Sequence, residues 1–152
     1  MVHALDEIRR VLVPDGILID MRPFAEHWRV EVVSSRGVKE TGQVDDLPDQ
    51  VSGDVASNEA LKEAESRGWF LREQEEFFPL FYSWDTPSEM EEFVDDDWAD
   101  FIGLSEEDRK STRAVWAVGE ADSRVRVRIK ILIARWRKAD WQPPNGTLSA
   151  PH

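Results

Sequence analysis

The first 21 residues place the strongest constraint on the fold. Apolar side chains recur at helical spacing over residues 2–12, which predicts an amphipathic helix. Pro14 and Gly16 then stop that helix and turn the chain. Residues 17–21 form a short apolar run without strict alternation, which is typical of a strand covered on both faces of a sheet. We therefore expect the chain to open with a helix, a turn and a buried strand, as the interior of an α/β domain does.

The rest of the chain predicts a hairpin, two more strands and several helices. Alternation over residues 28–44 around the turn at Ser34–Gly37 predicts the hairpin. Alternation over residues 124–136 gives the clearest strand signal, and residues 69–84 form a second, aromatic-rich strand. Two Ser/Thr residues, each followed three positions later by an acid, predict helix starts at Thr86 and Ser105.

Between the hairpin and the aromatic strand the pattern is weaker. Residues 45–57 are polar and contain Pro48 and Gly53, so we expect a loop there. Residues 58–67 predict a short helix that stops at Gly68. We expect a single domain over residues 1–139 and a flexible tail over residues 140–152.

Composition excludes several classes of protein. The formal net charge of −12 disfavours binding to nucleic acid or to anionic membranes, whose phosphates it would repel. The chain has no cysteine, which rules out disulfides, thiolate zinc sites and cysteine nucleophiles. Apolar runs are too short to span a bilayer, and no signal segment opens the chain. We expect a cytoplasmic protein.

The opening segment resembles class I S-adenosylmethionine-dependent methyltransferases where their chain enters the fifth strand of the sheet. In that family a helix ending in Arg-Val-Leu passes through a Pro-Gly-Gly-like turn into a buried strand. The matching residues here are Ala4-Leu5, Glu7-Ile8, Arg10-Val11-Leu12, Pro14-Asp15-Gly16 and Ile17-Leu18-Ile19.

This resemblance implies the carboxy-terminal half of the methyltransferase fold, an α/β class that is α+β as this half stands. Ile17–Met21 would be the fifth strand, Phe70–Trp84 the sixth and Arg124–Trp136 the seventh, with the seventh antiparallel between the other two. We therefore expect a partial Rossmann-like fold, with a three-stranded 5-7-6 sheet, an added hairpin and helices. The family's cofactor-binding half would precede residue 1.

The resemblance carries no cofactor site into this chain. The family needs a glycine-rich turn after its first strand, where the backbone approaches the cofactor closely. No two of the eight glycines here make a G-x-G pair. We therefore expect no cofactor to be bound by the chain alone, and S-adenosylmethionine is implied by the family only.

The segments that shape the methyl-acceptor pocket in the family correspond to the stretch after residue 21 and to the aromatic strand. His27 is the one histidine in such a place and is a weak candidate for a general base. We name no other catalytic residue. The candidate substrate-binding residues are Arg22, Phe24, His27, Trp28, Tyr82 and Trp84.

Two charge runs have simple structural explanations. Residues 89–108 contain ten acids and no base, which is typical of a solvated face, and they lack the spacing of a calcium loop, so we expect no metal site. Arg124, Arg126, Arg128 and Lys130 share one face of a strand. We expect them to pair with the acids at Glu73, Glu75 and Glu76 across the sheet rather than to bind phosphate.

Without a neighbour from the family's other half, Ile17–Met21 would be an edge strand, which invites pairing with another chain. We expect a homodimer, or a chain that supplies the missing half, to join there, and we expect no nucleic acid or membrane partner. One hypothesis is a non-catalytic methyltransferase-like module that dimerises or binds a small apolar or aromatic molecule. The alternatives are the acceptor-binding half of a split methyltransferase and an unrelated α+β ligand-binding module. Whether the chain is an enzyme stays open.

Overall fold

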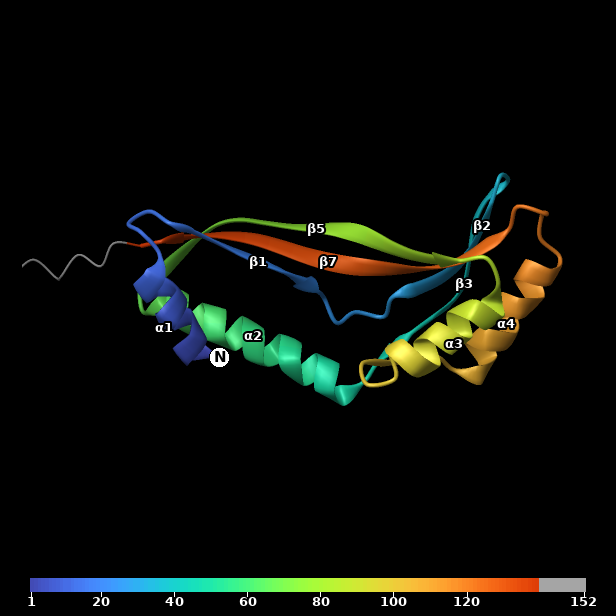
Figure 1. Cartoon of the computed structure of the whole chain (residues 1–152), viewed down its shortest axis with the longest axis horizontal. Coiled ribbons are helices and arrows are strands. Elements are labelled where there is room, and N and C mark those ends of the chain that lie inside the picture. The colour runs from blue at the N-terminus through green and yellow to red at the C-terminus, as the bar shows by residue number, and fades with distance from the viewer. Residues whose placement is uncertain (140–152) are drawn as a thin grey trace, which may run out of the picture.

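The computed structural model describes residues 1–139, and its sheet is organised around one long strand, β7 (Arg124–Lys138). On one side, β5 (Phe70–Trp84) pairs with β7 along its whole length. On the other side, β1 (Ile17–Pro23) pairs with the second half of β7, and β2 (Arg29–Ser34) pairs with the first half. β3 (Gly37–Gln43) continues the sheet from β2, and all these pairings are antiparallel (Figure 1).

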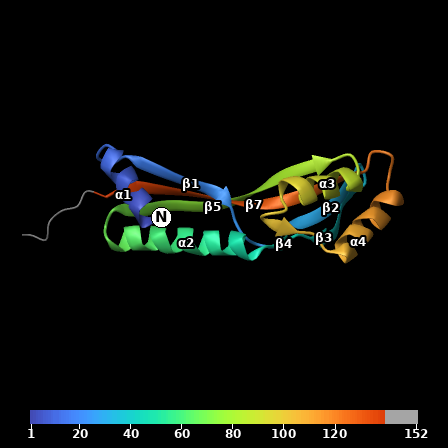
Figure 2. The same cartoon turned by 60° about the horizontal axis from the view of Figure 1, so that its bottom comes forward.

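The four helices of residues 1–139 lie in two pairs, one pair at each end of the elongated sheet (Figures 1 and 2). α1 (Val2–Val11) and α2 (Pro48–Ser66) cover the end that contains β1. α3 (Pro87–Asp97) and α4 (Glu106–Ala117) cover the end that contains the hairpin. The short strands β4 (Asp45–Asp46) and β6 (Ile102–Gly103) pair with each other beside the second pair of helices. The described part of the chain is therefore a mixed α+β fold with an open antiparallel sheet.

The two helix pairs pack against opposite faces of β7. At the hairpin end the buried residues of β7 are odd-numbered, from Val125 to Ile131, and they share a core with α3 and the hairpin. At the other end the buried residues are even-numbered, from Leu132 to Trp136, and Ala134 and Trp136 share a core with α1 and α2. Because strands twist, both helix pairs lie below the sheet in Figure 1 although they cover different faces. Ile131 and Leu132 are adjacent and both buried, so the change of face falls between them.

Several sequence predictions are confirmed. The hairpin, the aromatic strand and the strand from residue 124 all form, and the hairpin joins the main sheet. Thr86 and Glu89 form a reciprocal capping box at the start of α3. Ser105 caps α4 by accepting a hydrogen bond from the backbone N–H of Asp108, at 3.1 Å. These signals are local, and each is read from a few neighbouring residues.

The loop expected over residues 45–57 is wrong, because α2 begins at Pro48. Proline is favoured in the first turn of a helix, because the N–H groups there have no acceptor within the helix and the missing N–H of proline costs no hydrogen bond. Ser52 and Ser57 donate their hydroxyl hydrogens to the carbonyls of Pro48 and Gly53, four residues earlier, at 2.8 Å. The polar composition that suggested a loop belongs to an exposed first half of the helix, and its buried residues follow later, at Ala60, Leu61 and Ala64.

The added hairpin does not stand apart from the three expected strands, because β2 pairs with β7 and the main sheet has five strands in the described residues. The expectation that residues 17–21 are covered on both faces is wrong as well. Ile19 is 52% exposed and Met21 is 63% exposed, since no helix covers that face at this end. The tail predicted over residues 140–152 lies outside the described residues. Within residues 1–139, no helix is both long enough and apolar enough to cross a bilayer.

The change of face in β7 gives a stability test with neighbouring residues. Ile131→Ala and Leu132→Ala should each lower the free energy of unfolding by about 2–4 kcal/mol, because the two buried side chains lie on opposite faces of β7 and each leaves a cavity there. Ile133→Ala should cost less than about 1 kcal/mol, since its side chain is only partly buried. Urea unfolding measures all three. A strand with one buried face would show a large loss at only one of positions 131 and 132.

Candidate functional site

A gap in the pairing of β7 lies beside a cavity in the sheet. β1 pairs with residues 131–137 of β7 and β2 with residues 124–128, so Ile129 and Lys130 have no strand partner on that side. The connecting segment, residues 24–28, bends past them. The Phe24 N–H donates to the Lys130 carbonyl at 2.9 Å, and the Trp28 indole N–H donates to the Phe24 carbonyl at 3.0 Å. These two bonds hold the bend in place.

The cavity beside this bend has a volume of about 390 Å³. Its walls come from the bend, from the middle of β5 and from the unpaired part of β7. We call it the gap cavity. Its lining residues are Glu26, His27, Trp28, Arg29, Phe77, Phe78, Pro79, Arg128, Ile129 and Lys130.

The gap cavity combines aromatic walls with a cationic rim. Phe77 is 45% exposed and Phe78 is 40% exposed, which is unusual for large apolar side chains. Lys130 Nζ lies 4.5 Å from the centroid of the Phe77 ring and is ion-paired with Glu26. The lining includes three Arg or Lys residues and one Glu in a chain whose net charge is −12. Such a site favours a flat apolar molecule that carries a negative charge.

His27 lies on the rim of this cavity, with its side chain 59% exposed. Its Nδ1 is 3.6 Å from a carboxylate oxygen of Asp45, which follows the hairpin. The acid next to His27 in the sequence, Glu26, pairs instead with Lys130. His27 therefore has a carboxylate neighbour that the sequence did not reveal, although the separation is long for a hydrogen bond.

Asp46 is the most perturbed carboxyl near this rim. One of its oxygens, Oδ1, is buried and has no hydrogen-bond partner among the described residues. Burial raises the pKa of the Asp46 carboxyl, the nearby His27 opposes this shift, and neighbouring carboxylates reinforce it. The structure thus disfavours the charged form of Asp46.

Arg22 serves the fold rather than the gap cavity. Its guanidinium donates to Asp54 at 3.0 Å and to Asn58 at 2.5 Å, and its side chain is only 15% exposed. These bonds join the end of β1 to α2. Arg22 and Phe24 line a second cavity of about 260 Å³ between α2 and the sheet. Phe24 also meets Phe77 edge to face, with the ring centroids 5.4 Å apart.

Tyr82 and Trp84 belong to a packed aromatic cluster. Both contact Phe93 of α3 and Trp98, with ring centroids 5.1–6.1 Å apart. Trp28 touches Trp98 at 5.8 Å and is 6% exposed, so it connects this cluster to the wall of the gap cavity. Of the six candidate substrate-binding residues, only His27 and Trp28 line the gap cavity. The sequence did not indicate Phe77, Phe78, Arg128 and Lys130 as binding residues, although Phe77 and Phe78 stand in the aromatic strand.

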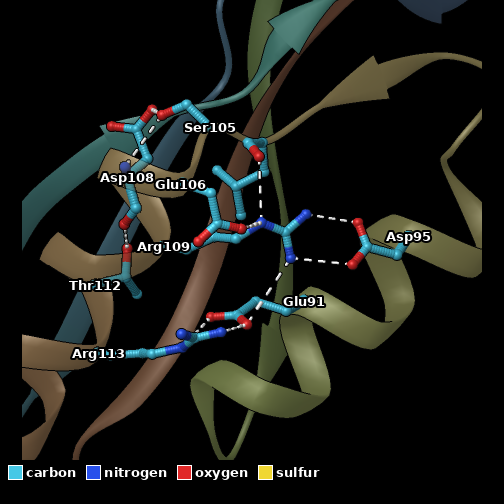
Figure 3. Close-up of polar contacts among 9 residues, drawn as sticks. Glu91, Asp95, Ser105, Glu106, Asp108, Arg109, Thr112 and Arg113 are labelled. Carbon is cyan, nitrogen blue, oxygen red and sulfur yellow. Dashed lines mark hydrogen bonds and ion pairs between the residues drawn. The ribbon is translucent and has the colours of Figure 1, made fainter.

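The acidic run forms ion pairs between α3 and α4 (Figure 3). Arg109 makes two hydrogen bonds with Asp95, at 2.5 and 3.0 Å, and these raise the pKa of the Arg109 guanidinium further above its usual range. Glu91 is 7% exposed and is paired with Arg113. Asp96 and Asp97 are exposed. Residues 1–139 contain no group of three or more carboxylates and histidines placed to hold a metal ion.

The basic face of β7 is paired, but not with the acids we expected. Arg126 and Arg128 both bind Glu31 of β2, at 2.7 and 3.0 Å, and Glu31 is 4% exposed. Glu73 binds Arg135, at 3.0 Å, and also Arg137. The expected pairing of residues 124–130 with the acids of β5 is therefore wrong. The hairpin supplies the acidic partner of Arg126 and Arg128 because it pairs with this half of β7.

Comparisons with known proteins give no relative: no family model, no curated protein and no solved structure matches this chain.

The perturbed Asp46 carboxyl predicts a pH-dependent stability. Its pKa is higher in the folded state, so its contribution is fully present below the usual value of 3.8 and is lost as pH rises through the folded pKa. Asp46→Asn should therefore raise the melting temperature at pH 7, and the gain should disappear below about pH 3.8. Thermal unfolding across this range measures it. The exposed Asp100→Asn should show no such trend, and an equal gain at every pH would contradict the assignment.

Proposed function

We propose that this chain is a small-molecule-binding module of methyltransferase ancestry that does not bind S-adenosylmethionine by itself. The ancestry is supported by the strand arrangement: β7 lies between β1 and β5 and is antiparallel to both. In the methyltransferase resemblance these strands correspond to the seventh, fifth and sixth. The chain contains no glycine-rich turn that would bring its backbone close to a nucleoside cofactor.

The gap cavity is the observation that carries the binding function. Its volume, about 390 Å³, lies in the range of small-molecule pockets. Phe77, Phe78 and Trp28 offer apolar contact, and Arg128 and Lys130, which are ion-paired with Glu31 and Glu26, stand beside it. The ligand class that fits is an aromatic ring system with one anionic group, such as an aryl carboxylate, phosphate or sulfonate.

Two further functions follow from particular observations. The outer edge of β1 has no partner in the described residues, which favours the acceptor-binding half of a split methyltransferase. The hairpin that joins the sheet beyond the three expected strands favours an unrelated α+β ligand-binding module. Both alternatives keep the gap cavity as the place where a small molecule binds.

An aromatic anion tests the binding function. We expect 2-naphthalenesulfonate to shift the indole N–H resonance of Trp28 in ¹H–¹⁵N spectra, because that ring lines the cavity. Lys130→Gln should weaken binding about tenfold, since it removes one charge-assisted contact. Lys39→Gln removes the same charge from an exposed position on β3 and should leave affinity unchanged. Equal weakening by the two variants, or no saturable shift of Trp28, would remove support for the site.

The proposal that the chain does not bind S-adenosylmethionine by itself has a separate test. Calorimetric titration of the chain with S-adenosylhomocysteine should give no heat of binding at concentrations up to about 1 mM. A complex with a dissociation constant of about 1 mM has a binding free energy of only about −4 kcal/mol, so this range also detects weak binding. The adenosine and amino-acid groups have no backbone turn to receive them. Micromolar binding by the isolated chain would overturn this part of the proposal and leave the gap cavity unaffected.

A further inference from the structure

β1 presents a free edge whose hydrogen-bonding groups can be assigned residue by residue. In the described residues β1 pairs only with β7, and it lies along the outer edge of the sheet (Figure 2). The Lys138 N–H donates to the Gly16 carbonyl at 2.8 Å, and the Phe24 N–H donates to the Lys130 carbonyl at 2.9 Å. In an antiparallel ladder successive residues point alternately toward and away from the partner. The amides of even-numbered residues therefore face β7, and those of Ile17, Ile19 and Met21 face outward.

These three residues form an edge without the usual protection. None is a proline or a charged residue, with which natural sheets commonly guard exposed edges, and the proline of this strand, Pro23, stands at its end. Ile19 and Met21 are 52% and 63% exposed. Their side chains lie on the face of β1 opposite to Leu18, which packs with the α1 and α2 core. Both the backbone and the side chains of this edge are thus left without a partner in the described chain.

The other long edge of the sheet is closed by its sequence. The Lys130 carbonyl points toward the β1 side, so the residue opposite it on β5, Pro79, has its backbone nitrogen directed away from β7. Proline has no N–H to donate, and Pro79 lies in the middle of the free edge of β5. At the third edge, α4 packs against β3, where Thr41 and Thr112 are hydrogen-bonded at 2.8 Å.

We propose that β1 pairs antiparallel with β1 of a second copy of this chain, about a two-fold axis at Ile19. In this register Ile19 lies opposite Ile19 of the partner, and Ile17 lies opposite Met21. All three outward amides on each copy then have a partner, because residues opposite each other in hydrogen-bonded pairs exchange two bonds. On the other face Leu18 meets Asp20, so the register opposes no like charges. The edge is self-complementary, which a two-fold interface requires.

The proposed pairing is independent of the gap cavity and predicts a weak dimer. A seven-residue edge is smaller than the roughly 800 Å² per partner of a standard stable interface. We expect a dissociation constant on the order of 10–100 µM. Sedimentation velocity should therefore show a monomer at low concentration and a dimer at a few hundred micromolar. Ile19→Lys places two like charges on the axis and should abolish the dimer, whereas Val38→Lys, an equally exposed apolar position on β3, should not.

The absence of cysteine allows a direct test of the register. In the proposed pair the Cα atoms at position 19 lie about 5.5 Å apart, a separation that a disulfide spans. Ile19→Cys should therefore form a disulfide-linked dimer under mild oxidation. Ile17→Cys and Met21→Cys should each cross-link poorly alone and should cross-link efficiently when mixed. Leu71→Cys, on the exposed edge of β5, is the matched control.

Each outcome decides the proposal. Selective linkage at position 19 and between positions 17 and 21, with concentration-dependent sedimentation that Ile19→Lys removes, supports it. A monomer at all concentrations, or equal linkage through Leu71→Cys, overturns it. Efficient linkage of Ile17→Cys with itself overturns the register. Binding of 2-naphthalenesulfonate, measured at protein concentrations below the dimer range, is expected to be unchanged in Ile19→Lys, so failure of either proposal is recognised separately.

Discussion

The hydrogen bonding of β7 on both sides is the constraint on which the rest of the fold depends. This single strand holds β5 along its full length and divides its other side between β1 and β2. It also serves two cores, because its buried residues change from odd to even numbers between Ile131 and Leu132. A strand that pairs with three others and packs against two helix pairs needs apolar side chains on both faces. On each face it needs them only along the part of the strand that a helix covers. Its arginines occupy the positions where no helix covers the strand.

The gap cavity is a direct result of that division. β1 and β2 are separate strands rather than one, and the two residues of β7 between them receive only the bend at residues 24–28. Main-chain bonds of Phe24 and the indole of Trp28 fix this bend, so the cavity is held by the backbone as well as by side chains. Preorganisation of this kind reduces the entropy lost when a ligand binds. The aromatic side chains of β5 stay exposed there because α3 extends only over the other end of the strand.

Much of the fold could be predicted from sequence because its signals are local. The hairpin, the capping box at Thr86 and the alternation of β7 each depend on a few neighbouring residues. The start of α2 could not be predicted in this way, because the three apolar residues that hold the helix to the core, Ala60, Leu61 and Ala64, come late in it. The candidate site was predicted only in part for a similar reason. Glu26 and Lys130 are 104 residues apart, and their pairing depends on strand order and register, which composition does not determine. His27 and Trp28 were found through the family resemblance, whereas Phe77 and Lys130 join them only in the folded sheet.

Pro79 has a consequence for how large an assembly of this protein can become. A sheet that can be extended at both edges grows without limit into fibres. Here one long edge offers outward amides at Ile17, Ile19 and Met21, and the opposite edge lacks a donor at its midpoint. In the proposed dimer the two β1 edges pair with each other, and the β5 edges that contain Pro79 stay outside. The proposed dimer would therefore present β5 strands interrupted by Pro79 along its long outer edges, which disfavours the addition of further copies.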